Sequence, residues 1–254
     1  MSNFLSKLKK VIGLGIKPIT TATPEGEKLL RQKTPLFDFG ENSTDQQNKA
    51  KWMKILVDFR EQEICYAMAG SQLGIPAQVF CLYHDVQNLM KAPILSKFMF
   101  NPEIIDCGGE TEFYESCMSC VDKDNIGVFA RVKRPFWIKV KYMDENGTEH
   151  IERFENFIAT VICHEMAHFR GQLHKDIAEE IIIGIPKNKR NEYRTLSPYN
   201  ILRKDGEYTE PSVKKPTEQI IVEYDNSRSV AENIENPKYI QRPELCVESS
   251  QNHV

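Results

Sequence analysis

Residues 156–170 read N-F-I-A-T-V-I-C-H-E-M-A-H-F-R, a stretch whose apolar side chains recur at helical spacing. On a helix, His164 and His168 lie four residues apart and project from one face, so both imidazoles can bind one metal ion. Glu165 follows the first histidine and can reach a water molecule at that ion as a general base. The pattern predicts a metal-binding H-E-x-x-H helix, with a buried helix carrying two incidental histidines as the alternative.

Two histidines need a third ligand, and the residues alone leave two sources open. Proteases with H-E-x-x-H take a Glu or His from downstream. The other source is Cys117 in Y-E-S-C-M-S-C (114–120). Its thiolate would bind zinc or ferrous iron strongly and leave a fourth position for water, although a single cysteine is more often a small buried hydrophobe. The downstream candidates are His174, Asp176, Glu179 and Glu180.

The segments before this helix favour an α+β fold in which small mixed or antiparallel sheets pack around it. One long helical pattern is followed by several short strand-like runs, and Asn146-Gly147 is a typical hairpin turn. No glycine-rich phosphate loop accompanies them. The pattern predicts a helix over 45–69 and strands over 79–83, 98–105, 136–143 and 148–154.

Three zones divide the 254 residues. We expect residues 1–27 to be an N-terminal lead-in and residues 28–178 to be the catalytic domain. Residues 179–254 are polar and punctuated by proline, which predicts an irregular extension without its own core and a candidate surface for a partner.

Charge, hydropathy and cysteine content exclude several classes of protein. Lys and Arg number 33 against 36 Asp and Glu, so no basic footprint for nucleic acid is expected. No apolar run is long enough to cross a bilayer. Seven cysteines without framework spacing favour a reducing compartment, and we expect the cytoplasm. The lysine-rich residues 1–24 leave organelle targeting open.

Three motifs, in order, resemble those of the peptide deformylase family over about residues 27–178. C-Y-A-M-A-G-S-Q (65–72) is similar to G-x-G-Φ-A-A-x-Q, and E-S-C-M-S (115–119) is similar to E-G-C-Φ-S. H-E-M-A-H (164–168) matches H-E-x-x-H, and F-R-G-Q-L-H-K-D (169–176) resembles the H-L-x-G-x-L-F-x-D that ends the family pattern.

The resemblance implies a hydrolase that removes the formyl group from N-terminal formylmethionine of a peptide or nascent polypeptide and releases formate. Cys117, His164 and His168 would bind one divalent metal ion, in this family usually Fe2+, replaceable by Zn2+, Ni2+ or Co2+. Glu165 would take a proton from the attacking water. Gln72 and the backbone N–H of Met118 would stabilise the oxyanion.

Apolar residues beside the metal helix and the first motif are candidates for a pocket that takes the methionine side chain. Ordinary core packing is the alternative for each of them. The candidates are Tyr66, Ala67, Phe157 and Val161.

The chain departs from the family pattern outside the predicted catalytic set. Both glycines of the first motif are replaced, by Cys65 and Ala67, and Ser116 replaces the glycine of the second. Cys120 stands where Val or Ile is common, and Ala167 replaces the usual Asp. We therefore expect a divergent enzyme. The competing hypotheses are an H-E-x-x-H endopeptidase and a module that binds N-termini without cleaving them.

Overall fold

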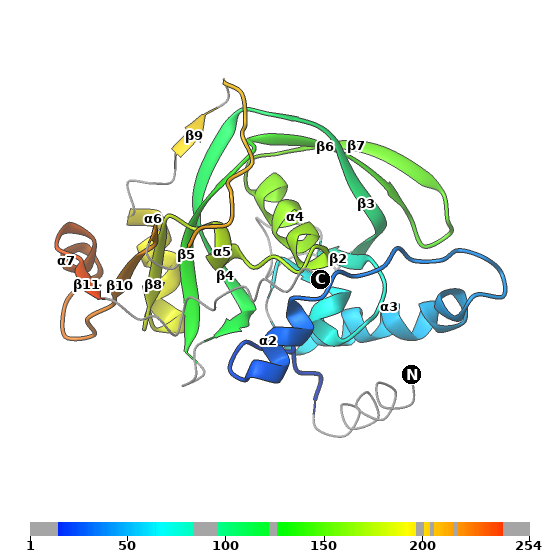
Figure 1. Cartoon of the computed structure of the whole chain (residues 1–254), viewed down its shortest axis with the longest axis horizontal. Coiled ribbons are helices and arrows are strands. Elements are labelled where there is room, and N and C mark those ends of the chain that lie inside the picture. The colour runs from blue at the N-terminus through cyan, green and yellow to red at the C-terminus, as the bar shows by residue number, and fades with distance from the viewer. Residues whose placement is uncertain are drawn as a thin grey trace.

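The structure is a computed structural model in which two sheets flank a central helix, α4 (Figure 1). The predicted α+β architecture is confirmed. The residues that the structure describes are 15–63, 65–83, 96–121, 126–196, 201–203, 206–215 and 218–240.

The helices and strands alternate irregularly along the chain. The helices are α2 (Pro24–Leu30), α3 (Thr44–Gln62), α4 (Asn156–Phe169), α5 (His174–Ile177), α6 (Arg190–Leu196) and α7 (Val230–Glu235), with short 3-10 turns at Gly70–Leu73 and Lys187–Lys189. The strands are β1 (Ala67–Ala69), β2 (Val79–Tyr83), β3 (Ser96–Gly108), β4 (Glu110–Val121), β5 (Gly127–Arg134), β6 (Trp137–Met143), β7 (Glu149–Glu155), β8 (Glu180–Ile183), β9 (Ile201–Arg203), β10 (Ile220–Glu223) and β11 (Lys238–Ile240).

The first sheet is antiparallel and has the order β1-β2-β3-β6-β7. Strands β6 and β7 form the predicted hairpin, in which the Asp144 carboxylate accepts the N–H groups of Asn146 and Thr148 at 2.8 and 2.9 Å. Gly147 takes a φ of 79°, a conformation that glycine adopts without strain. The Asn-Gly turn therefore sets the register of this sheet edge.

The second sheet has the order β11-β10-β8-β5-β4-β9, with β8 and β10 parallel and the other pairs antiparallel. Its pairing is interrupted where β4 passes the central helix. From Ser116 to Val121 the strand advances five residues, while its partner β5 moves only two, from Phe129 to Gly127. The three extra residues form a wide bulge, which redirects side chains that a regular strand would place on opposite faces.

Helix α4 packs its apolar side against the first sheet. Ile162 and Met166 share one buried cluster with Phe80 and Ile138 of that sheet. The helix ends at Phe169, and the N–H of Gly171 just beyond it donates to the His168 carbonyl at 3.1 Å. Gly171 has a φ of 70°, and a Cβ there would lie 2.1 Å from the Arg31 carbonyl oxygen, so only glycine lets α2 approach the end of α4.

The helix predicted over 45–69 is correct for its first part and wrong for its end. Ser43 caps α3 by accepting the Gln46 N–H at 3.0 Å, but the helix stops at Gln62. Residues 67–69 form β1 and pair with β2. Hydrogen bonding to a neighbouring strand outweighs the helical spacing of the apolar residues here.

The expectation that residues 179–254 form an irregular extension is corrected for the part that the structure describes. Strands β8 and β10 lie within the second sheet, and Tyr193 and Tyr224 pack with aromatic residues of β4 and β5. Prolines such as Pro186 and Pro237 stand between elements, where they interrupt no ladder. This zone therefore completes the apolar core of the second sheet.

Within the described residues, no helix is both long enough and apolar enough to pass through a bilayer. Residues 1–14, which hold most of the lysine-rich lead-in, and residues 241–254 lie outside the described part.

Candidate metal centre

The bulge of β4 and the helix α4 bring the three predicted ligands together. One ligand atom each from Cys117, His164 and His168 lies within 4.8 Å of the other two. Cys117 Sγ is 3.4 Å from His168 Nε2, and these two residues are 5% and 2% exposed. Two segments that are 47 residues apart in the sequence thus meet at one buried point.

Glu115 orients His164. Its Oε2 lies 2.7 Å from His164 Nδ1, and the Arg134 guanidinium donates to both carboxylate oxygens at 2.8 and 3.0 Å. Because the carboxylate accepts a hydrogen bond from Nδ1–H, the lone pair of Nε2 is left for a cation. Burial alone would raise the pKa of Glu115, but Arg134 and the hydrogen bond from His164 hold it well below its usual value.

The surrounding charges favour a cation at the imidazole of His164. Burial opposes the charged ring, yet the hydrogen bonds that His164 donates to Cys117 and Glu115 raise its pKa well above the usual value. Cys120 donates a hydrogen bond to the Cys117 sulfur, and this bond, with His168 beside it, lowers the pKa of the Cys117 thiol against the cost of burial. The same field that favours a proton favours a metal cation.

Glu165 and Gln72 complete the cluster. Glu165 is 6% exposed and its Oε2 has no hydrogen-bond partner in the described residues, so burial raises its pKa. Gln72 Nε2 lies 3.4 Å from Cys117 Sγ and donates to Ser119 Oγ at 2.9 Å. Its Oε1 accepts the Ala69 N–H at 3.1 Å, which fixes the amide against the bulge.

This donor set fits a divalent cation. A thiol and two imidazoles are ligands that Zn2+ and Fe2+ prefer, and three of them leave an open position. Unpaired buried polar atoms are costly in an apolar interior. Glu165 Oε2 is buried without a partner in the described residues, as expected for a carboxylate that faces the water of an ion.

The downstream ligand candidates make other contacts. Glu179 pairs with Arg131 at 3.2 Å, and Glu180 accepts the Tyr114 hydroxyl at 2.8 Å. Asp176 contacts Arg31 and accepts the Leu173 N–H, and His174 belongs to a different group with Cys117. No described acid or histidine downstream forms a ligand group with both His164 and His168.

The sequence model of the family described as Polypeptide deformylase matches residues 16–181, which is more than half of the chain. The chain belongs to the polypeptide deformylase family.

Curated relatives are peptide deformylases of modest identity. That of Rhizorhabdus wittichii is 34% identical over 112 residues, or 43% of this chain and 60% of that protein. That of Limosilactobacillus reuteri is 29% identical over 166 residues, or 61% of this chain and 87% of that protein. The chain thus spans three fifths of the first relative's length and most of the second's.

Solved deformylase structures share the fold. The peptide deformylase from Synechococcus elongatus in complex with actinonin has a TM-score of 0.52 at 24% identity and covers 66% of this chain and 81% of that chain. A Met-Ala-Ser-bound peptide deformylase from Acinetobacter baumannii has a TM-score of 0.52 at 22% identity and covers 63% of this chain and 97% of that chain.

The residues predicted to line a pocket in this deformylase-family chain pack close together. The rings of Tyr66 and Phe157 meet edge to face with centroids 4.9 Å apart, and both residues pack against the buried cluster that holds Ala67 and Val161. The ring of Phe113 also lies beside Phe157, with the two ring centroids 5.7 Å apart. The sequence did not indicate this neighbour. Whether this group holds a methionine side chain is a prediction.

The sequence alone did not identify the residues of this chain that hold the predicted ligands and Gln72 in place. Arg134 lies outside the three motifs, and Glu115 and Ser119 stand in the second motif without an assigned role. Met118 follows Cys117 inside the bulge, so its amide lies on the segment that Gln72 contacts. The pairing of β4 with β5 places Arg134 opposite Thr111, and its side chain reaches Glu115 farther along β4.

Proposed function

We propose that the protein is a metal-dependent peptide deformylase that removes the formyl group from N-terminal formylmethionine and releases formate. The observation that carries this proposal is the group of Cys117, His164 and His168 with the buried Glu165 beside it, in a chain of the deformylase family. The Met-Ala-Ser ligand of the Acinetobacter baumannii structure supports a peptide N-terminus as the substrate.

Cys117, His164 and His168 would hold the divalent ion, for which Fe2+ is the family's usual choice and Zn2+, Ni2+ and Co2+ are substitutes. The bound ion supplies Lewis acidity, which polarises a carbonyl and lowers the pKa of water. The thiolate must stay reduced to serve as a ligand. We therefore place the enzyme in a reducing compartment, the cytoplasm, where nascent polypeptides are made.

Glu165 is the proton shuttle. The oxygen of water bonds to the formyl carbon while Glu165 takes one of its protons. When the carbon–nitrogen bond breaks, Glu165 returns that proton to the leaving amine, so formate and a free N-terminus result. Because burial raises the pKa of Glu165, the carboxyl group is closer to the working pH than an exposed glutamate and can both accept and give up the proton.

Gln72 and the Met118 amide stabilise the negative oxygen that develops during the attack. The Gln72 side chain is already held against Cys117 by its bonds to Ser119 and Ala69, so little reorganisation is needed when it donates to the oxyanion. This interaction strengthens only in the transition state, and it therefore lowers the barrier.

The proposal is tested with full-length protein purified anaerobically and loaded with Fe2+. We expect formate release from formyl-Met-Ala-Ser and none from the acetylated peptide. Glu165→Gln should abolish release while metal content and actinonin binding persist. A binding module would instead show no turnover in either protein, and an endopeptidase would cleave internal bonds. No formate from any formylated peptide at full metal occupancy would refute the proposal.

A further inference from the structure

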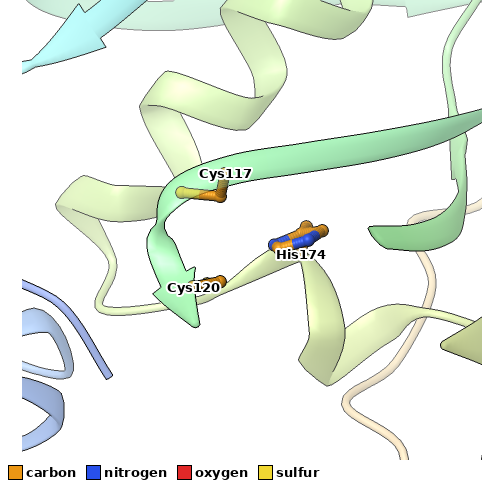
Figure 2. Close-up of side chains that lie close together, drawn as sticks. All are labelled: Cys117, Cys120 and His174. Carbon is orange, nitrogen blue, oxygen red and sulfur yellow. The ribbon is translucent and has the colours of Figure 1, made fainter. Parts of the chain in front are cut away.

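A second group of ligand side chains lies next to the first. Cys117, Cys120 and His174 each place one ligand atom within 4.8 Å of the other two. Figure 2 shows β4 curving between the two cysteines and His174 of α5 facing both. The cysteines are 5% and 0% exposed and His174 is 1% exposed, so the group is closed off from solvent.

The bulge of β4 creates this group. In a regular strand, residues three apart point to opposite faces of the sheet. The extra residues between Ser116 and Val121 bring Cys117 and Cys120 to one side instead.

His174 has the tautomer of a metal ligand. Its Nε2 lies 3.3 Å from the Val128 carbonyl oxygen, which can only accept, so Nε2 carries the proton. The lone pair is then on Nδ1, which is buried with no hydrogen-bond partner in the described residues. An imidazole held by a backbone carbonyl on one nitrogen and open on the other is the usual arrangement at metal sites. Left empty, that nitrogen carries the full cost of desolvation.

Two departures from the family pattern coincide here. Cys120 stands where the deformylase motif commonly has Val or Ile, and His174 stands at the Phe of H-L-x-G-x-L-F-x-D. These positions are 54 residues apart in the sequence but meet at Cys117. At these two positions the chain has a thiol and an imidazole, which are ligand types that zinc prefers.

We propose that Cys117, Cys120 and His174 form a second metal site for a thiophilic divalent ion, Zn2+ foremost, which shares the Cys117 thiolate with the site of His164 and His168. A thiolate sulfur has lone pairs for two ions. The two sites would make a dinuclear centre in which the second ion ties the bulge of β4 to α5. This inference goes beyond the deformylase function, which needs only one ion.

Metal stoichiometry tests the second site independently of activity. The apoprotein, prepared and kept reduced under anaerobic conditions, is titrated with Co2+ while thiolate charge-transfer absorption is followed, and zinc-loaded protein is analysed by mass spectrometry. We expect about two ions per chain for the wild type and about one for Cys120→Val and for His174→Phe. Cys117→Ser should bind neither ion tightly.

Cys81→Val is the matched control, since Cys81 is also 0% exposed but lies in β2. It should keep about two ions. One ion in the wild type, or two ions in Cys120→Val, would overturn the proposal.

X-ray absorption of zinc-loaded wild-type protein keeps the proposal testable if the variants fail to fold. A shared thiolate gives three zinc–sulfur bonds for two ions, or about 1.5 sulfurs per zinc, whereas the first site alone gives about one. A ratio near one at full loading would contradict the second site. Loss of formate release would not change this ratio, so the two proposals fail separately.

Discussion

The Glu115 carboxylate lies 2.7 Å from Nδ1 of His164, and both side chains are nearly excluded from solvent. This contact fixes the ring orientation of a predicted ligand from the opposite sheet. The buried Arg134 holds the carboxylate in turn. The proposed metal centre is therefore supported by a chain of charged contacts from Arg134 of β5 through Glu115 of β4 to His164 of α4.

Glu115→Gln should weaken metal binding about 10–100-fold, because the amide keeps the shape of the carboxylate but loses its charge. Arg134 would then be buried without a counter-ion, which costs about 3–5 kcal/mol of folding free energy. Competition with a chelator measures the first effect and denaturant unfolding the second. Glu112→Gln is the control, since Glu112 lies on the same strand and contacts Arg131. Equal metal affinities in the two variants would contradict the role of Glu115 in orienting His164.

The ligand set itself is tested by exchanging the competing candidates. Cys117→Ser should lower metal affinity by orders of magnitude because a hydroxyl is a far poorer ligand than a thiolate. Glu179→Gln should leave metal binding unchanged, since Glu179 pairs with Arg131 and Lys133. Isothermal titration calorimetry of both apoproteins with the metal ion decides whether Cys117 or Glu179 is the third ligand. The reverse pattern would support the endopeptidase hypothesis.

Gln72→Ala should lower kcat about 10²–10³-fold with little change in KM, because the lost hydrogen bond forms mainly in the transition state. Formate release under saturating substrate measures this. Gln78→Ala is the control, since the Gln78 side-chain amide donates to the Thr34 carbonyl at 2.9 Å and is not part of the Cys117, His164 and His168 group. An unchanged kcat for Gln72→Ala would remove Gln72 from the oxyanion site.

The sequence predicts the local elements well because their signals are local. The apolar periodicity of α4 and the Asn146-Gly147 turn lie within the segments they shape, and the strand over 79–83 is found with the predicted ends. The same reasoning extended α3 to residue 69, because spacing alone does not show that residues 67–69 pair with β2.

The residues that support the ligands could not be predicted, because their roles depend on contacts between residues that are far apart in the sequence. From the sequence, His174 could be considered only as a downstream ligand that joins His164 and His168. In the structure, the bulge of β4 brings Cys120 close to His174 instead. Arg134 becomes meaningful only when β5 lies beside β4. Motifs identify ligands by their fixed spacing in the sequence. The residues that orient those ligands do not lie at a fixed sequence distance from them.

Tyr66→Val tests whether the apolar group beside α4 selects the N-terminal side chain. The ring of Tyr66 meets Phe157 at 4.9 Å, so a smaller residue would leave room next to the α4 helix. If these residues line the pocket, kcat/KM for a formyl-Phe peptide relative to formyl-Met should rise roughly 10-fold or more, the scale of a filled or emptied apolar subsite. Parallel formate assays on the two peptides measure the ratio.

A purely structural role for Tyr66 gives a different pattern. The variant would then lose about 3–5 kcal/mol of stability, as large-to-small changes in a core do, with the ratio of the two peptides unchanged. Tyr224→Val provides the comparison, since Tyr224 is buried in the cluster of the second sheet, away from Phe157. A shifted ratio in Tyr66→Val but not in Tyr224→Val assigns Tyr66 to substrate selection, because a general loss of packing would affect both peptides equally.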